Sequence, residues 1–134
     1  MTEHAEFVVE IPFHDIDLMR VVWHGHYYKY FELARTELFR RHHLDIDQMK
    51  ELGLMFPVIE SHCRYVSSLK YGETAVIRAR MVEVEYRLKV TYQVFEATTE
   101  RRVAKGYTIQ VAVNAETGEM HMATPPVIRD LFEA

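Results

Sequence analysis

The sequence predicts an α+β fold in which one long helix is wrapped by an antiparallel sheet of about five strands. Residues 24–43 contain no proline and carry apolar side chains at spacings of three to four, the period of a helix. Much of residues 59–113 alternates between apolar and polar side chains, the period of a strand. These runs lie too close together for crossover helices, so neighbouring strands are expected to be antiparallel.

The N-terminal part of the chain predicts one strand and then the long helix. Residues 6–11 alternate, which places Phe7, Val9 and Ile11 on one face of a strand, and residues 12–23 form an irregular connection. The helix carries an apolar stripe made of Tyr27, Tyr30, Phe31, Leu33, Ala34, Leu38 and Phe39. Because this stripe is wider than a one-sided surface helix needs, we expect the helix to be covered on much of its circumference.

The rest of the chain predicts a short helix, a series of strands and a terminal helical turn. The short helix covers residues 45–52 and ends at Gly53, and a change of parity near Met81 indicates a bulge. A tight turn is expected at residues 116–119, and the prolines at 125–126 start the last helical turn. The expected long strands are residues 59–69, 74–86, 88–94 and 107–113.

Length and composition favour one folded domain that covers residues 1–134. A chain of 134 residues with 49% hydrophobic and 27% charged residues has the usage of a globular protein. There is no room for separate cofactor and substrate domains. The longest run without a charged residue, residues 106–115, is shorter than the ~18 residues of a membrane helix, so no membrane span is expected.

Charge and cysteine content exclude further classes of function. The net charge of −4 provides no general basic surface, so we expect no nucleic-acid partner. A single cysteine, Cys63, allows no intrachain disulfide and agrees with a reducing cytoplasm. The N-terminal residues include acids and lack an apolar signal region, so a cytoplasmic location is expected.

The segment of residues 14–27 concentrates acids, imidazoles and aromatic side chains between the first strand and the long helix. It offers no Ser, Thr, Asp or Asn at the expected N-cap, which leaves backbone N–H groups at the helix start without an obvious side-chain partner. These donors are suited to hold a substrate carbonyl oxygen. The alternative is that Asp15 or Asp17 reaches forward and caps the helix.

This segment resembles the opening of the 4-hydroxybenzoyl-CoA thioesterase family, whose members have the hot-dog fold. The resemblance is carried by Asp15-x-Asp17, Val22, Tyr27 and Phe31-Glu32-x-Ala34-Arg35, and the spacing from Asp17 to Arg35 matches without a gap. Beyond Arg35 the likeness is one of pattern. Arg20 departs from the family, which often has glycine at this position; it would narrow the pocket mouth or add a cation.

The resemblance implies hydrolysis of an acyl-CoA or acyl-carrier-protein thioester without a cofactor. The family's loop aspartate corresponds to Asp17 and its helix-start backbone donor to His24. Asp17 would attack the carbonyl or deprotonate a water molecule, while helix-start amides stabilise the oxyanion, an effect typically worth about 3 kcal/mol. Substrate contacts are expected from Arg20, Trp23, Gly25, His26 and Tyr27.

Other chemistry-bearing residues have structural interpretations that we favour. His24 and His26 are a tempting zinc pair, but positions i and i+2 of a helix point apart and no further ligands are suitably spaced, so no metal is expected. Cys63 is expected to be a small buried residue and not a nucleophile. Glu32 and Arg35 are expected to form an ion pair or a contact with a partner subunit.

The resemblance also implies a homodimer as the minimum assembly, with a tetramer as an alternative, and an active site between subunits. The phosphates of the carrier require local positive charge, for which the candidates are Arg64, Lys70, Arg87, Lys89, Arg101, Arg102 and Lys105. Two other functions compete with thioester hydrolysis. The string from His24 to Tyr27 loosely resembles that of 3-hydroxyacyl-thioester dehydratases, although their Gly-His-Phe-Pro setting is missing, and Arg20 keeps a non-catalytic acyl-thioester binding module open.

Overall fold

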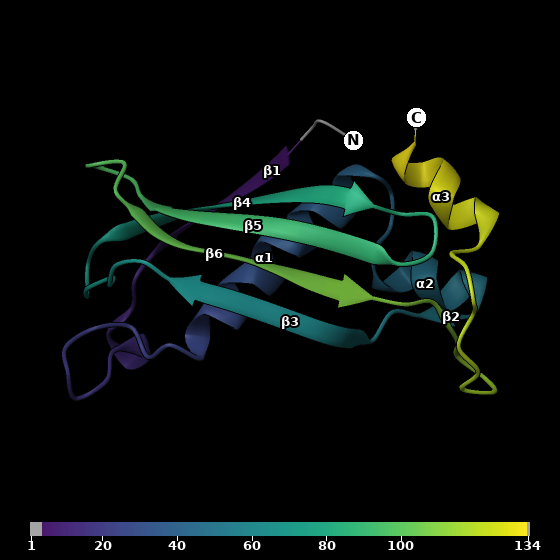
Figure 1. Ribbon diagram of the computed structural model, residues 1–134, viewed down its shortest axis with the longest axis horizontal. Coiled ribbons are helices and arrows are strands. Elements are labelled where there is room, and N and C mark those ends of the chain that lie inside the picture. The colour runs from purple at the N-terminus through teal and green to yellow at the C-terminus, as the bar shows by residue number, and fades with distance from the viewer. Residues whose placement is uncertain (1–3, 134) are drawn as a thin grey trace.

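A computed structural model describes residues 4–133 of the chain (Figure 1). The chain begins with strand β1 (His4–Glu10), the 3-10 helix η1 (Phe13–Asp15), the long helix α1 (His26–Arg41) and helix α2 (Ile46–Leu52). The strands β2 (Leu54–Met55), β3 (Val58–Tyr65), β4 (Thr74–Glu83), β5 (Leu88–Glu96), β6 (Arg102–Gln110) and β7 (Val113–Asn114) follow, and helix α3 (Pro126–Phe132) comes last.

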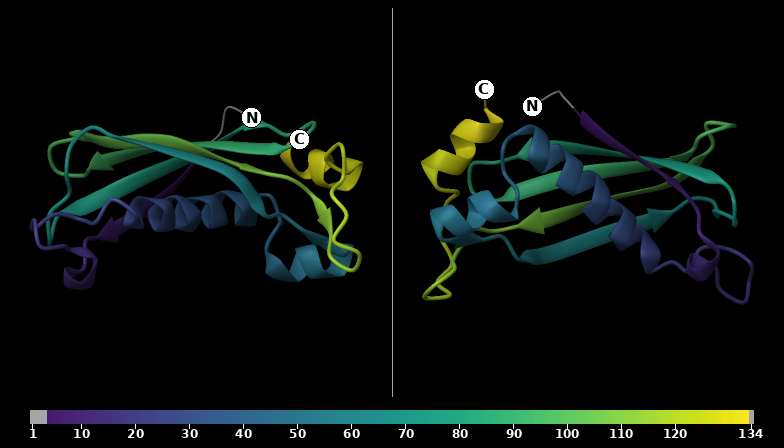
Figure 2. Two further views of the ribbon diagram at one scale, coloured as in Figure 1. Left: turned by 60° about the horizontal axis from the view of Figure 1, so that its bottom comes forward. Right: turned by 180° about the vertical axis from the view of Figure 1, so that it is seen from behind.

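The main sheet has five antiparallel strands in the order β1-β4-β5-β6-β3, and β2 pairs with β7 in a small second sheet. Helix α1 crosses one face of the main sheet, while α2, α3 and the small sheet lie together beyond one of its ends (Figures 1 and 2). The expected fold class, one long helix wrapped by an antiparallel sheet of about five strands, is confirmed. The register of β4 against β5 shifts between Met81 and Glu83, which confirms the bulge.

The centre of the core is a contact between α1 and the sheet. The ring of Phe31 stacks on that of Tyr92 in β5, with ring centroids 4.3 Å apart and planes within 4°. Gly106 in β6 lies under this pair, and a Cβ atom there would be 2.7 Å from the Phe31 ring and 2.1 Å from the backbone oxygen of His62. Glycine is therefore required where the helix comes closest to the sheet.

The phase of β6 differs from what its apolar alternation indicates. By register, Gly106 and Thr108 stand opposite Tyr92 and Val90, which are buried on the helix side of the sheet. Tyr107 and its neighbours in phase consequently point to the other face. The stacked aromatic pair fills the space on the helix side, so that face of β6 takes small or polar residues.

Several boundaries and exposures also differ from the sequence prediction, and strand β6 covers Arg102–Gln110 and not the expected residues 107–113. Helix α1 begins at His26 and not at position 24, because the carbonyls of Trp23 and His24 accept from the amides of His26 and Tyr27, three residues on, in turns that precede the regular helix. Leu33 is 37% exposed, since the sheet of one chain covers only one side of α1. Strand β3 ends at Tyr65 and is mostly exposed, because it forms an edge of the sheet.

The ends of the short helices follow from local chemistry. Asp45 and Gln48 form a capping box at the start of α2, and Gly53 ends it with a φ of 68°, in the left-handed region that favours glycine. Both features agree with the predicted helix over residues 45–52. Among residues 4–133, no helix is long and apolar enough to cross a bilayer.

Candidate active site

The two loop aspartates have different surroundings, and Asp15 is the sealed one. Its side chain is 1% exposed and accepts from Nζ of Lys29 at 2.7 and 2.8 Å and from the hydroxyl of Tyr30 at 2.6 Å. Burial alone would raise the pKa of Asp15, but the hydrogen bonds from Lys29 and Tyr30 and the nearby positive charges outweigh it and hold the pKa below the usual value. Asp15 is thus a buried anion that ties the loop to α1.

Asp17 lies on a tight hairpin that projects past the N-terminal end of α1 (Figures 1 and 2). The hairpin is closed by the amide of Asp17, which donates to the carbonyl of Val21, and by a bridge between Ile16 and Val22. The Asp17 side chain is half-buried, and its Oδ1 accepts from the amide of Met19 at 2.8 Å. Within residues 4–133 its Oδ2 has no hydrogen-bond or ion-pair partner, so this oxygen is available.

Arg20 occupies the position of this hairpin that needs a left-handed backbone. Its φ is 67°, which glycine adopts without cost and other residues adopt with strain. The amide of Arg20 donates to the carbonyl of Asp17, and its side chain is exposed. This geometry gives a backbone reason for a glycine at the matching family position and leaves the Arg20 side chain free at the surface.

The start of α1 carries unpaired backbone donors. Gly25 is the N-cap residue and has no side-chain cap, and among the described residues neither the amide of His24 nor that of Gly25 donates a hydrogen bond. Neither Asp15 nor Asp17 caps the helix, so the capping alternative is wrong. The amides are therefore open to a ligand oxygen.

Trp23 covers the turn before α1. The residue is 48% exposed, and its ring lies against Gly25, where a Cβ atom would be 2.2 Å from the ring. It also makes edge contact with the ring of His26 at 5.3 Å and a tilted contact with that of His24 at 5.1 Å. The expected substrate-contacting residues Trp23, Gly25 and His26 are thus brought together with His24.

Tyr27 is placed differently from the other expected substrate contacts. Its side chain is 2% exposed and packs edge-on against Tyr30 and Tyr65. Burial raises the pKa of Tyr27 to about 12. In the isolated chain Tyr27 is a core residue beneath the turn and offers almost no surface to a ligand.

Three further candidates, Cys63, Glu32 and Arg35, lie outside the hairpin and the turn before α1. Cys63 is half-buried, and burial raises the pKa of its thiol, which disfavours the thiolate that a nucleophile needs. Glu32 and Arg35 form no ion pair within 4 Å in the described part of the chain. Burial raises the pKa of the Tyr92 hydroxyl, and the nearby Arg35 guanidinium lowers that pKa in part. Over residues 4–133, no three His, Cys, Asp or Glu side chains are grouped to hold a metal ion.

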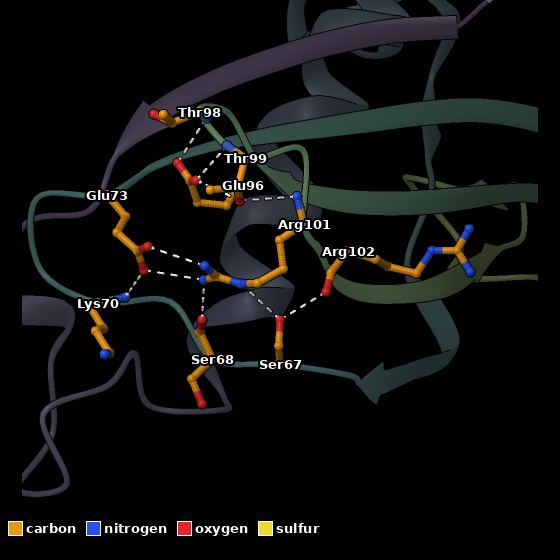
Figure 3. A network of polar contacts seen from close by, with 9 residues as sticks. All are labelled: Ser67, Ser68, Lys70, Glu73, Glu96, Thr98, Thr99, Arg101 and Arg102. Atoms are coloured by element: carbon orange, nitrogen blue, oxygen red, sulfur yellow. Dashed lines mark hydrogen bonds and ion pairs between the residues drawn. The ribbon is translucent and has the colours of Figure 1, made fainter.

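Two residues that the sequence did not single out for the site support it. The hydroxyl of Tyr65, at the end of edge strand β3, donates to the carbonyl of His24 at 2.9 Å. Arg101, expected only as one of seven phosphate-binding candidates, is bonded to Glu73, to the hydroxyl of Ser67 and to the carbonyl of Ser68 (Figure 3). No local pattern signals either contact, because both join segments distant in sequence.

The Arg101 network holds the loop on which the hairpin rests. The carbonyl of Leu69, within this loop, accepts from the amide of Val22 at 2.9 Å. Glu73 also accepts from the amide of Lys70, which closes the loop on itself (Figure 3). Arg101 is thereby committed to structure and is unavailable to bind a phosphate.

One long helix across a five-stranded antiparallel sheet, with an acidic loop at the helix start, is the architecture of a hot-dog protein of the thioesterase class. The sequence profile of the Thioesterase-like superfamily matches residues 11–132, so the chain belongs to this superfamily. The resemblance to the 4-hydroxybenzoyl-CoA thioesterase family is confirmed at this level, and with it thioester hydrolysis as the general activity of the class.

Individual proteins agree with this assignment. The chain is 32% identical over 126 residues to a protein of Synechocystis provisionally named as an esterase, covering 93% of this chain and 76% of that protein. It is 24% identical over 110 residues to YneP of Bacillus subtilis, provisionally named as an acyl-CoA thioesterase, covering 81% and 79%. The structure of a mutant 4-hydroxybenzoyl-CoA thioesterase with 4-hydroxybenzoyl-CoA matches with a TM-score of 0.84 at 17% identity, covering 96% and 97%.

Proposed function

We propose that the chain hydrolyses an acyl thioester carried by coenzyme A or acyl carrier protein, with Asp17 and His24 as the catalytic residues. The observation that carries this proposal is the contrast between the two aspartates beside a helix start with open amides. Asp15 is sealed by Lys29 and Tyr30, whereas one carboxylate oxygen of Asp17 has no partner among residues 4–133. A free carboxylate and unpaired amides are the two components that attack on a thioester requires.

The proposed reaction uses these groups in separate roles. The amides of His24 and Gly25 hold the thioester oxygen as negative charge develops on it. The Asp17 carboxylate either attacks the carbonyl carbon, so that the C–S bond breaks and water hydrolyses the resulting anhydride, or removes a proton from the attacking water. Both routes consume one water and give an acid and a thiol, and no cofactor or metal enters either.

Substrate contacts are proposed for the surface around the turn. Trp23 and His26 present ring faces and edges beside Gly25, and Arg20 offers an exposed cation to the carrier. Tyr27, the remaining expected contact, would support the turn from the core side and would not touch the substrate, because it is almost fully buried. YneP and the 4-hydroxybenzoyl-CoA complex support coenzyme A as the carrier.

A homodimer is proposed as the minimum assembly, with a tetramer as the alternative, in a cytoplasmic setting. Strand β3 is a free edge, and Ile59 and Tyr65 on it are 57% and 44% exposed. A partner at this edge would lie beside the turn that Tyr65 holds. The mass of the wild-type protein in solution, measured by light scattering, should equal two or four chains, and a stable monomer would contradict the proposal.

The proposed activity is tested by the products released from a panel of thioesters. Purified protein is given short, long and aromatic acyl-CoA substrates and the same acyl groups on acyl carrier protein, and free thiol and free acid are measured. Equal amounts of acid and thiol from at least one substrate are expected. Loss of water from a 3-hydroxyacyl thioester, or binding without release of thiol, would instead indicate the dehydratase or the binding module.

A further inference from the structure

The outer face of the main sheet, on the side away from α1, carries two rows of side chains that cross all five strands. From β1 to β3, the first row is His4, Arg80, Thr91, Tyr107 and His62, and the second is Glu6, Arg78, Gln93, Lys105 and Arg64. All of these residues except Glu6 line one hollow of about 390 Å³. We call this hollow the outer-face pocket.

The outer-face pocket is strongly and specifically basic. Within residues 4–133, the side chains of Arg64, Arg80 and Lys105 have no ion pair or hydrogen bond, and all three are exposed. Arg78 is paired with Glu6, which lies just outside the pocket, and also stacks over the Phe95 ring. In the described part of the chain, three cations of the pocket therefore have no acidic partner.

The other acid next to the pocket, Glu60, does not neutralise these cations. Glu60 in β3 accepts from the hydroxyl of Tyr107 and has no ion pair in the described part of the chain. On the other flank of Tyr107, the Nζ of Lys89 lies 4.7 Å from its ring centre. The middle of the floor, Thr91 and Gln93, is polar and uncharged. Hydrogen-bonding groups in the floor and unpaired cations on its rim are a combination suited to an anion.

The concentration of like charges in the outer-face pocket destabilises the protein when no ligand is bound. Arg64 and Lys105 stand directly opposite each other in the antiparallel pair of β3 and β6, and like charges in that position are destabilising. Arg78 and Arg80 point to the same face of β4, two residues apart. The chain as a whole has a net charge of −4, so this concentration of positive charge is a local feature. A bound anion would remove the repulsion.

We propose that the outer-face pocket binds a small anion that carries two or more phosphate charges, such as a diphosphate or a nucleoside diphosphate. Its volume suits a small ligand. A second copy of the chain is a poor occupant, because a two-fold interface would place the pocket against itself, and like charges would meet. The site goes beyond the proposed hydrolysis, because its side chains lie on the face of the sheet away from α1, whereas α1 crosses the opposite face (Figure 2).

The test is a calorimetric titration of the whole protein with inorganic pyrophosphate at low ionic strength. Wild-type protein should bind one pyrophosphate per chain. Arg80→Gln and Lys105→Gln should each weaken binding by about tenfold, the effect of losing one charge-assisted hydrogen bond. Lys50→Gln, which removes an exposed charge on α2 that forms no ion pair among residues 4–133, is the matched control and should bind as wild type does.

Three results would overturn the proposal: no binding by wild type, equal binding by all variants, or tighter binding of a ten-nucleotide RNA than of pyrophosphate. Thermal unfolding verifies that the variants fold, and their midpoints should equal or exceed that of wild type because repulsion is relieved. Binding of ADP with the same loss in both variants would support a nucleotide as the source of the phosphates. Pyrophosphate binding by Asp17→Asn should match wild type, which separates this site from the proposed hydrolysis.

Discussion

The hydroxyl of Tyr65 donates to the carbonyl of His24 at 2.9 Å, and this bond joins the free-edge strand to the turn that starts α1. The ring centroids of Tyr65 and His24 lie 6.0 Å apart in an edge-on contact. Because the open amides belong to the same turn, the Tyr65 bond fixes the direction in which they point. Edge strand β3, which is otherwise mostly exposed, is thus hydrogen-bonded to the turn that carries the proposed oxyanion donors.

Tyr65→Phe tests this connection as a positioning effect. Loss of one hydrogen bond of about 1 kcal/mol should lower kcat for thioester hydrolysis about fivefold and leave KM nearly unchanged, because the amides act mainly on the transition state. Tyr86→Phe, which alters an exposed tyrosine without a hydrogen bond in the described chain, is the control. A rise in KM at constant kcat would show that Tyr65 serves substrate binding instead.

Asp15→Asn tests the structural role of the sealed aspartate. The substitution removes the negative charge that Lys29 and Tyr30 surround, so the free energy of unfolding should fall by about 1–3 kcal/mol. Asp47→Asn on α2 changes an exposed carboxylate and should stay within about 0.5 kcal/mol of wild type. Urea unfolding measures both. An Asp15 variant as stable as the Asp47 variant would contradict a structural anion.

The same aspartate predicts how stability depends on pH. The folded-state pKa of Asp15 lies below its ordinary value of 3.8, so its contribution is present above that value and is lost as the pH falls through the folded-state pKa. The stability difference between wild type and Asp15→Asn should therefore be largest near pH 6 and shrink towards pH 3. Unfolding curves across this range measure it, and a constant difference would refute the assignment.

Gly106→Ala tests the closest contact between helix and sheet. The added methyl group would overlap the His62 backbone and the Phe31 ring, so stability should fall by about 1–3 kcal/mol or more. Gly72→Ala is not a suitable control, because Gly72 has a positive φ. Ala104→Gly, at the neighbouring position on the same face of β6, is a better comparison and should cost less, about 1 kcal/mol. If Ala104→Gly lowered the free energy of unfolding more than Gly106→Ala, β6 would have to shift freely under α1, which would contradict the assigned close contact.

Periodicity predicted the long helix and the main strands but not every boundary or every face. The spacing of Tyr27, Phe31 and Leu38 predicted α1, and the change of parity at Met81 predicted the bulge. The inward face of β6 was not predictable, because the need for Gly106 arises from a helix 75 residues earlier in the chain. Sequence patterns report local burial, whereas this contact depends on which segments meet.

The candidate site shows the same division. Asp15, Asp17 and the uncapped helix start are adjacent in sequence, so the segment could be recognised before its geometry was known. Which aspartate is sealed depends on Lys29 and Tyr30 turning back from α1. The roles of Tyr65 and Arg101 depend on long-range hydrogen bonds that no local spacing indicates.

The most direct test of the proposed hydrolysis is the rate of thiol release by Asp17→Asn on the best substrate of the panel. Asparagine keeps the oxygen that accepts from Met19 and removes the charge, so the hairpin should persist while the reacting group is lost. We expect kcat to fall about 10²- to 10⁴-fold, with the melting temperature preserved and Asp47→Asn fully active. Full activity in Asp17→Asn would contradict the central claim that this carboxylate performs the chemistry.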